Sequence, residues 1–223
     1  MERSGFYHWL EERLELQSLS DDVQSKCVPP HVNLFYCFGG LVFTGFLFQF
    51  VTGAGLTLFY RPSVLDSFLG ALAAGFDFAW LLRCFHRLSS NFLLLLLVLH
   101  ATRVFFTGGH LRPRELTWTS GLALTALTSA FGASGYTIVW DQVGFWAYQV
   151  VSAIPASLDA LLPQPLPRAG AALVGILRGG PALGQLALSR CFAAHTLLLP
   201  AVLLAALAAH FVLIRKQGTS GPL

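Results

Sequence analysis

Apolar residues along this chain gather in long blocks instead of alternating with polar ones. A helix that crosses a bilayer needs about 20 mostly apolar residues, and four blocks reach that length, at 34–58, 79–106, 116–139 and 190–214. A fifth block, AGAALVGIL at 169–177, is too short to span and is expected to form a surface helix. The pattern predicts an all-α membrane protein in which residues 1–223 form a single domain, a bundle of four transmembrane helices.

The N-terminal segment predicts a surface helix, and the distribution of positive charge predicts how the chain is oriented in the membrane. Residues 6–19 mix apolar and charged positions as an amphipathic helix does, and such a helix is expected to lie on the membrane surface. Four spans place both termini on one side, named the n side here, and its excess of Lys and Arg over the opposite p side is typical of the stromal or cytoplasmic face. The n side holds Arg3, Arg13, Lys26, Arg103, Arg112, Arg114, Arg215 and Lys216, and the p side holds Arg61, Arg83, Arg87, Arg168, Arg178 and Arg190.

Composition supports the membrane assignment and excludes other classes. Hydrophobic residues make up 55% of the chain and charged residues only 11%, with a mean hydropathy of +0.63. A soluble protein would need a polar shell that this composition lacks. The net charge of +3 is scattered, so nucleic acid is not expected as a partner. The four cysteines, Cys27, Cys37, Cys84 and Cys191, form no C-x-x-C pair, which argues against a disulfide framework or a zinc site.

Histidines recur at similar intervals in two of the spans. His86 and His100 are 14 residues apart in the second span, and His195 and His210 are 15 apart in the fourth. A helix turns about 100° and rises about 1.5 Å per residue, so each pair stays near one face over about 21–22 Å. Both spans run from the p side to the n side. Matching by depth therefore pairs His86 with His195 near the p side, and His100 with His210 near the n side.

Two imidazoles at one depth can hold a haem iron from opposite faces, which leaves no open coordination position and suits electron transfer. Two such haems would form an electron path across the bilayer. Zinc is disfavoured, because two ligands at each level fall short of its usual four. Taken singly, each histidine is explained as well by a satisfied hydrogen bond within packed helices. The recurrence of four at matched depths favours haem, since ionisable groups within a membrane are costly.

Glycines and arginines near these depths each allow two interpretations. Glycines 14 apart in the first and third spans would let the edge of a macrocycle approach the backbone, or would serve small-residue helix packing. Arginines near the histidines would bind haem propionates, or would extend to lipid headgroups. The glycines are Gly39, Gly53, Gly121 and Gly135; the arginines are Arg83 and Arg87 at the p level and Arg103 and Arg114 at the n level.

Several stretches carry a family resemblance: NLFYCFGG, FYRP, RCFHR, HATRVFFTGGHLRPRELTW, GYTIVWDQVGFWA, LRGGPALGQ and the ending HFVLIRKQGTSGPL. With them, over nearly its whole length, the chain resembles the cytochrome b family in the split, four-span form of the cytochrome b6f complex of oxygenic photosynthesis. The resemblance implies that the four histidines are axial ligands of two b haems. It also implies that Cys37 attaches a third, c-type haem covalently on the n side, although the residues alone suggest only a small apolar core position. Arg215 and Asp22 match family positions near that haem and a quinone pocket.

The resemblance further implies an activity and a setting. The chain would be a subunit of a plastoquinol–plastocyanin reductase, with a soluble cytochrome c as the other acceptor, that oxidises plastoquinol, reduces quinone and translocates protons. It would lie in the thylakoid membrane of a chloroplast or cyanobacterium, in a dimeric complex, and would be inactive alone, with no catalytic residue of its own assigned. The implied partners are subunit IV, cytochrome f, the Rieske iron–sulfur protein, small subunits and membrane lipid, and the implied pigments are a chlorophyll a and a carotenoid.

The chain departs from the family pattern at three places. Cys191 and Ala194 stand beside His195 where bulkier residues are typical. Val139 stands before the Trp of WDQ where the family usually has Pro, which alters a turn at the p-side quinol site. The connection between the third and fourth spans is longer than usual and rich in Pro and Ala. Two other hypotheses stay open: a dihaem membrane-anchor subunit of a dehydrogenase, a class that generally lacks the PRELTW and VWDQVGFW stretches, and a transporter or structural membrane protein with incidental histidines.

Overall fold

A computed structural model describes residues 32–64, 77–159 and 168–218, together with Gly5, His8, Glu11, Gln17 and Asp21. The surface helix predicted for 6–19 lies, apart from single positions, outside these described residues, and so does Asp22. The chain divides into two compact units, Met1–Leu34 and Phe35–Leu223. The second unit holds the long helices.

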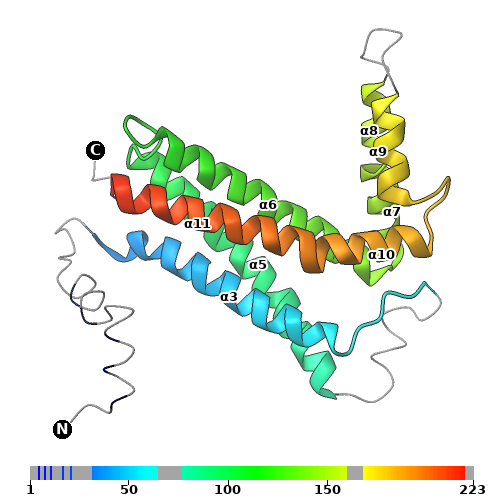
Figure 1. Cartoon of the computed structure of the whole chain (residues 1–223), viewed down its shortest axis with the longest axis horizontal. Coiled ribbons are helices and arrows are strands. Elements are labelled where there is room, and N and C mark those ends of the chain that lie inside the picture. The colour runs from blue at the N-terminus through cyan, green and yellow to red at the C-terminus, as the bar shows by residue number, and fades with distance from the viewer. Residues whose placement is uncertain are drawn as a thin grey trace. The chain divides into compact units, whose positions relative to one another are not determined.

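Four helices are long and apolar enough to cross a membrane, which confirms the predicted spans and the all-α membrane fold (Figure 1). The described helical segments, in chain order, are η1 (Leu34–Cys37), α3 (Phe38–Thr57), α5 (Asp77–Phe106), α6 (Glu115–Val139), α7 (Gln142–Val151), α8 (Ile154–Leu158), α9 (Ala169–Arg178), α10 (Gln185–Ala193), η2 (Ala194–Leu198) and α11 (Leu199–Gln217).

The fourth span is a composite helix. α10, η2 and α11 follow one another without a break, and η2 is a π-helical turn in which the Leu199 N–H donates to the Ala194 carbonyl five residues earlier. Pro200 follows immediately, and its ring would clash with a carbonyl of the preceding turn in a regular α-helix. The wider π turn relieves that clash and adds one residue to the helix without breaking it.

The long helices pack around a shared apolar core. α3 packs along α5, and α6 packs along α11. Figure 1 shows α6 and α11 running side by side, and α3 crossing near α5. All four helices contribute buried side chains to one cluster, which comprises Val42, Phe46, Leu93, Leu97, Leu124, Leu203 and Leu207. In sequence each of these residues falls between the two glycines or the two histidines of its helix, so the core lies between the two histidine levels.

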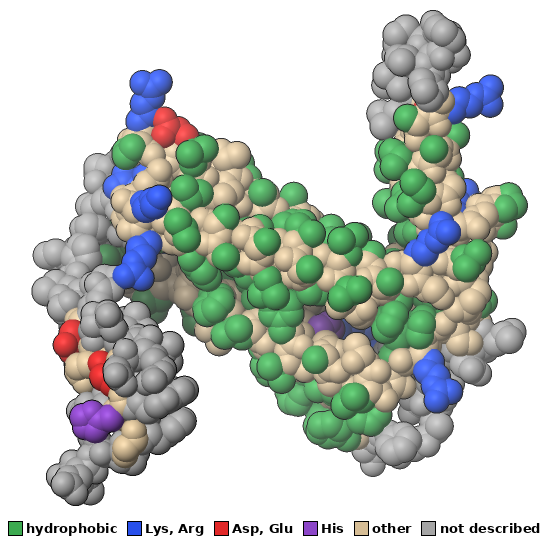
Figure 2. All heavy atoms as spheres, in the orientation of Figure 1, with side chains coloured by type: hydrophobic (Ala, Val, Ile, Leu, Met, Phe, Trp, Pro, Cys, Tyr) green, Lys and Arg blue, Asp and Glu red, His purple; other side chains and the backbone are tan. Residues whose placement is uncertain are grey.

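The outer surface of the bundle is apolar. Many large hydrophobic side chains are exposed on the long helices, such as Val51, Phe92 and Leu197. An apolar surface of this extent is explained by contact with the lipid of a membrane. Figure 2 shows these side chains covering the helices, with Lys and Arg gathered near the helix ends. The chain is therefore a multi-pass membrane protein.

The long connection between the third and fourth spans is helical over its described parts. α9 confirms the short helix expected at 169–177, and α7 and α8 precede it. Asp159 accepts from the Gly170 N–H at 2.7 Å and the Ala171 N–H at 2.8 Å, which caps the first turn of α9. Arg178 at the end of α9 donates to the Ser152 hydroxyl and to the Gln149 carbonyl, both at 2.8 Å, so this arginine joins α9 to α7.

Candidate functional site

Each of the four histidines lies with its ring against one of the four glycines. A Cβ added to the glycine would approach Cε1 of the facing histidine at 3.0–3.4 Å, so any larger residue there would push the ring. The distances are 3.2 Å for Gly53 and His86, 3.0 Å for Gly39 and His100, 3.2 Å for Gly135 and His195, and 3.4 Å for Gly121 and His210. The glycines thus provide room for the imidazoles, in a way that general helix packing does not require.

The π turn brings the unequal histidine spacings into register. His86 and His100 are separated by 14 residues of regular α-helix, while His195 and His210 are separated by 15 residues that include η2. A π turn accommodates one additional residue in a helix, so the longer interval covers nearly the same rotation and rise as the shorter one. Gly121 and Gly135, which face the second pair, are 14 apart like Gly39 and Gly53.

The structure brings the histidines together in two pairs, one at each level. His195 lies within electrostatic range of His86 across the bundle, and His100 lies within range of His210. Within the described residues, no three His, Cys, Asp or Glu side chains come together as a metal centre built from protein ligands alone would need. Two imidazoles at each level with glycine backbone beside them fit a flat macrocycle, which supplies its own equatorial ligands.

Hydroxyl groups on the neighbouring helices fix the orientation of three histidines. Nδ1 lies 2.8 Å from the Thr52 hydroxyl in His86, 2.8 Å from that of Ser134 in His195, and 2.7 Å from that of Ser120 in His210. Each hydroxyl donates its own proton to a carbonyl of its helix, at Phe48, Ala130 and Thr117 respectively. The hydroxyl must therefore accept from Nδ1–H, which leaves Nε2 unprotonated and available as a metal ligand.

Sequence reasoning missed these three hydroxyl residues. Each one stands directly before a histidine-facing glycine, as Thr52-Gly53, Ser120-Gly121 and Ser134-Gly135. That dipeptide recurrence is visible in the sequence, but its meaning depends on which helix face meets the histidine. At the fourth glycine the pattern breaks, because Phe38 precedes Gly39. Within the described part of the chain, the buried Nδ1 of His100 has no hydrogen-bond partner.

Cys37 and Arg103 lie beside the n-level histidines. Cys37 ends η1 two residues before Gly39, and its side chain is exposed, whereas Cys84 is half-buried and Cys191 is buried. The Arg103 guanidinium lies 4.5 Å from the centre of the Tyr36 ring, a cation–π contact that holds it against the start of the first span. Nε of Arg103 is buried and makes no hydrogen bond to the described residues. The Arg103 guanidinium therefore places a positive charge at this level, with Nε available to an anionic group.

The other predicted arginines are distributed along the helix ends. Arg83 and Arg87 are on the histidine-bearing helix α5, three residues before and one after His86. Arg114 precedes the first residue of α6 and its Nε donates to the Gly218 carbonyl at 3.5 Å, beyond the end of α11. Arg215 is exposed in the last turn of α11. Their neighbourhood is compatible with both propionate binding and contact with headgroups.

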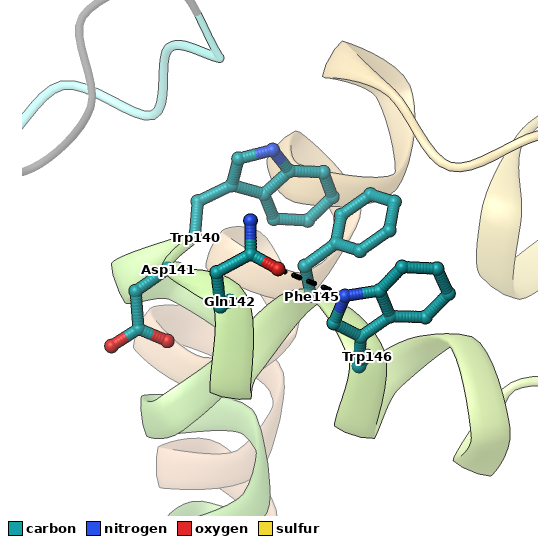
Figure 3. A pocket seen from close by; sticks show the side chains of 5 residues that line it. All are labelled: Trp140, Asp141, Gln142, Phe145 and Trp146. Atoms are coloured by element: carbon teal, nitrogen blue, oxygen red, sulfur yellow. Dashed lines mark hydrogen bonds between the residues drawn. The ribbon is translucent and has the colours of Figure 1, made fainter.

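A shallow hollow of about 250 Å³ opens at the p-side end of α6 and is lined by Trp140, Asp141, Gln142, Phe145 and Trp146 (Figure 3). Figure 3 shows the rings of Trp140, Phe145 and Trp146 around the Gln142 side chain, which accepts from Trp146 Nε1 at 2.9 Å. α6 continues as a helix through Val139, and the following Trp140 has φ of 56°, a left-handed conformation uncommon for a bulky residue. The WDQVGFW stretch thus forms an aromatic recess on a bent backbone.

Tyr60 connects the end of the first span to the C-terminal end of α6, next to the WDQVGFW stretch. Its hydroxyl donates to the Ile138 carbonyl at 2.5 Å, and its ring packs 5.5 Å from that of Phe192. Burial, with a further contribution from the nearby Cys191, raises the pKa of Tyr60 to about 12. The phenol therefore stays protonated and keeps donating well above neutral pH.

The fold and the site together define a multi-pass membrane protein with half-buried imidazole pairs at two depths. The chain is 50% identical over 222 residues to cytochrome b6 of Heterocapsa triquetra, covering 98% of this chain and 100% of that one. It is 48% identical over 222 residues to cytochrome b6 of Oltmannsiellopsis viridis, covering 99% and 100%. A chain of a hyperthermophilic respiratory Complex III superposes with a TM-score of 0.81 at 29% identity, over 96% of this chain and 56% of that one.

The model of the family Cytochrome b/b6/petB matches residues 23–218, and the chain belongs to this family. It is accordingly a haem-bearing electron-transport protein of a membrane and a subunit of an oxidoreductase complex. Family membership favours this function over the transporter and dehydrogenase-anchor hypotheses. The chain spans little more than half the length of the Complex III chain, so the match does not extend to the rest of that chain.

Proposed function

We propose that this chain holds two bis-histidine b haems, one between His86 and His195 and one between His100 and His210. When bound, the two haems supply one-electron carriers at two depths of the membrane. The chain would serve as the electron-transfer subunit of a plastoquinol-oxidising complex in a thylakoid membrane. The observation that carries the proposal is the set of four half-buried imidazoles, each facing a helix glycine, arranged in two pairs.

The protein supplies orientation, insulation and charge for these groups. The hydroxyls of Thr52, Ser120 and Ser134 keep Nε2 of three histidines free to bind iron. The apolar core around Leu93 and Leu203 excludes water between the two levels. Half-buried Arg103, whose Nε is buried, would neutralise a propionate on the n side, where partial burial strengthens the attraction between opposite charges. Arg83, Arg87 and Arg114 would bind propionates at their own levels.

Substitution of the ligands tests this assignment. His86→Leu and His195→Leu are each expected to remove the same b haem from the purified complex, and His100→Leu and His210→Leu to remove the other. Reduced-minus-oxidised spectra and haem-to-protein ratios measure the loss. Loss of different haems from His86→Leu and His195→Leu would refute the pairing, and a wild-type protein without a b-type band would refute haem binding itself.

We also propose that Cys37 bears a third, covalently attached haem on the n side. Its sulfur is exposed at the end of η1, within two residues of the glycine that faces His100, and Arg215 and Asp22 are assigned to the same neighbourhood by the family resemblance. Haem staining of the denatured chain should be positive in the natural protein and absent in Cys37→Ser. Staining that survives in Cys37→Ser would exclude this attachment point, while Cys84→Ser serves as the matched control.

The aromatic hollow at WDQVGFW is proposed to form this chain's share of a p-side quinol site. Its rings suit a quinol head and an isoprenoid tail, and the Gln142 and Asp141 side chains offer polar groups at its edge. Subunit IV, cytochrome f, a Rieske protein and small subunits would complete the dimeric complex, with a chlorophyll a and a carotenoid as bound pigments and plastocyanin or a soluble cytochrome c as acceptor. Trp146→Ala in the purified complex is expected to raise the KM for plastoquinol, and an unchanged KM would place the quinol elsewhere.

A further inference from the structure

Three of the four histidines have a hydroxyl behind Nδ1, and one does not. His86, His195 and His210 lie 2.7–2.8 Å from the hydroxyls of Thr52, Ser134 and Ser120. Nδ1 of His100 is buried and has no hydrogen-bond partner among the residues that the structure describes. The difference is confined to one ligand at the n level, and both p-level histidines are hydrogen-bonded.

The local geometry around His100 otherwise repeats that around His86 on the same two helices. A Cβ on Gly53 would lie 3.2 Å from Cε1 and 3.8 Å from Nδ1 of His86, and a Cβ on Gly39 would lie 3.0 Å and 3.4 Å from the same atoms of His100. The residue before the glycine is Thr52 at one level and Phe38 at the other. A hydroxyl at position 38 would therefore stand where Thr52 stands, and only the side chain decides whether Nδ1–H is paired.

A hydrogen bond from Nδ1–H makes the opposite nitrogen a stronger donor to a metal. Partial withdrawal of the proton raises the electron density of the ring, which fixes its orientation and increases the basicity of Nε2. A more basic axial ligand stabilises ferric over ferrous iron, and hydrogen bonding around the ligands is one of the means by which a protein sets a haem potential. A hydrogen bond at Nδ1 of an axial histidine therefore lowers the potential of its haem relative to that of the same haem with an unpaired ligand.

We propose that Thr52, Ser120 and Ser134 are positioning residues for the axial histidines, and that Phe38, which places no hydroxyl beside Nδ1 of His100, keeps the reduction potential of the n-level haem more positive than a hydroxyl at position 38 would. The inference rests on the haem assignment proposed above. The expected difference in potential follows from one missing hydroxyl.

The test compares isosteric pairs of variants in the purified complex. Phe38→Ser and Phe38→Ala both remove the ring, and only the former adds a hydroxyl beside His100. The n-level haem is expected to titrate at a more negative potential in Phe38→Ser than in Phe38→Ala. Thr52→Val and Ser134→Ala, which delete a hydroxyl with little change in shape, are expected to shift the p-level haem to a more positive potential.

Thr128→Ala is the matched control, because Thr128 is a buried hydroxyl of α6 that donates to the Leu124 carbonyl and reaches no histidine. Its two potentials should equal those of the natural protein. The low-spin ferric EPR signal gives a second measure, which should move for the n-level haem in Phe38→Ser and for the p-level haem in Ser134→Ala.

The two proposals fail in distinguishable ways. Identical potentials and EPR signals in Phe38→Ser and Phe38→Ala, with both haems present, would overturn the role of the missing hydroxyl and leave the haem assignment intact. Equal shifts in Thr128→Ala and Ser134→Ala would also overturn it, since the effect would then be one of general packing. A complex that lacks b haems altogether would refute the assignment on which the inference rests.

Discussion

At the scale of single residues, each of the four histidines is matched by one glycine on a neighbouring helix. Four glycines place backbone against four imidazoles, and three hydroxyl residues that precede them turn the rings. Residue spacing indicates the glycines and the histidines, but it leaves open whether the glycines serve helix packing. Contact with the rings supports a role at the histidine site.

Gly135 and Gly132 offer a direct comparison within one helix. A Cβ at Gly135 would lie 3.2 Å from His195, whereas nothing lies within 4 Å of a Cβ at Gly132. Gly135→Leu is expected to lose most of the p-level haem and Gly132→Leu to keep it, as measured by haem-to-protein ratio. Both changes improve helix propensity, by up to about 1 kcal/mol, so a loss in the first alone cannot be a loss of helix stability. Equal haem content in the two variants would contradict the prediction.

Tyr60 gives a pH dependence with a defined sign. Because its folded pKa of about 12 exceeds the ordinary value of about 10, the neutral phenol is favoured by folding. Its stabilising contribution is complete below about pH 10 and is lost as the pH rises through about 12. Ultraviolet titration of tyrosinate should show a late-ionising group that disappears in Tyr60→Phe, while the pKa of Tyr148, which burial also raises, is unaffected. A titration curve that Tyr60→Phe leaves unchanged at high pH would rule this out.

At the scale of elements, the π turn of the fourth span explains a spacing that the sequence left uneven. On a regular helix, the interval of 15 between His195 and His210 corresponds to a slightly larger rotation than that of 14 in α5. The structure places the additional residue in η2, next to Pro200. The two histidine-bearing helices can then present their rings at the same depths.

Deletion of Leu197 tests this explanation. Leu197 is 73% exposed and lies within η2, so its removal is expected to convert the π turn to α-helix and to keep both b haems. Leu95 is exposed in α5, which is α-helical between its two histidines. Its deletion should rotate His100 by about 100° relative to His86 and remove a haem. Difference spectra on the two variants provide the measurement, and the loss of both haems on deleting Leu197 would contradict the explanation.

At the scale of the whole molecule, the distribution of charge predicts the orientation in the membrane. Positive residues are more numerous on the side proposed for both termini than on the opposite side, which favours termini on the stromal or cytoplasmic face. A reporter fused after Leu223 is therefore expected to be accessible from that face. The same reporter inserted at Gly180, between α9 and α10, should be accessible only from the opposite face; accessibility of both from one face would contradict the predicted topology.

The sequence by itself determined the number of spans, their bounds to within a few residues, and the four histidines, since a bilayer requires long apolar blocks and makes ionisable residues within them conspicuous. Only the tertiary structure decided the role of Thr52, Ser120 and Ser134, the unpaired Nδ1 of His100 and the function of the π turn. Those features depend on contacts between helices far apart in the chain, and on a local widening of one helix, which residue spacing along a single regular helix cannot express.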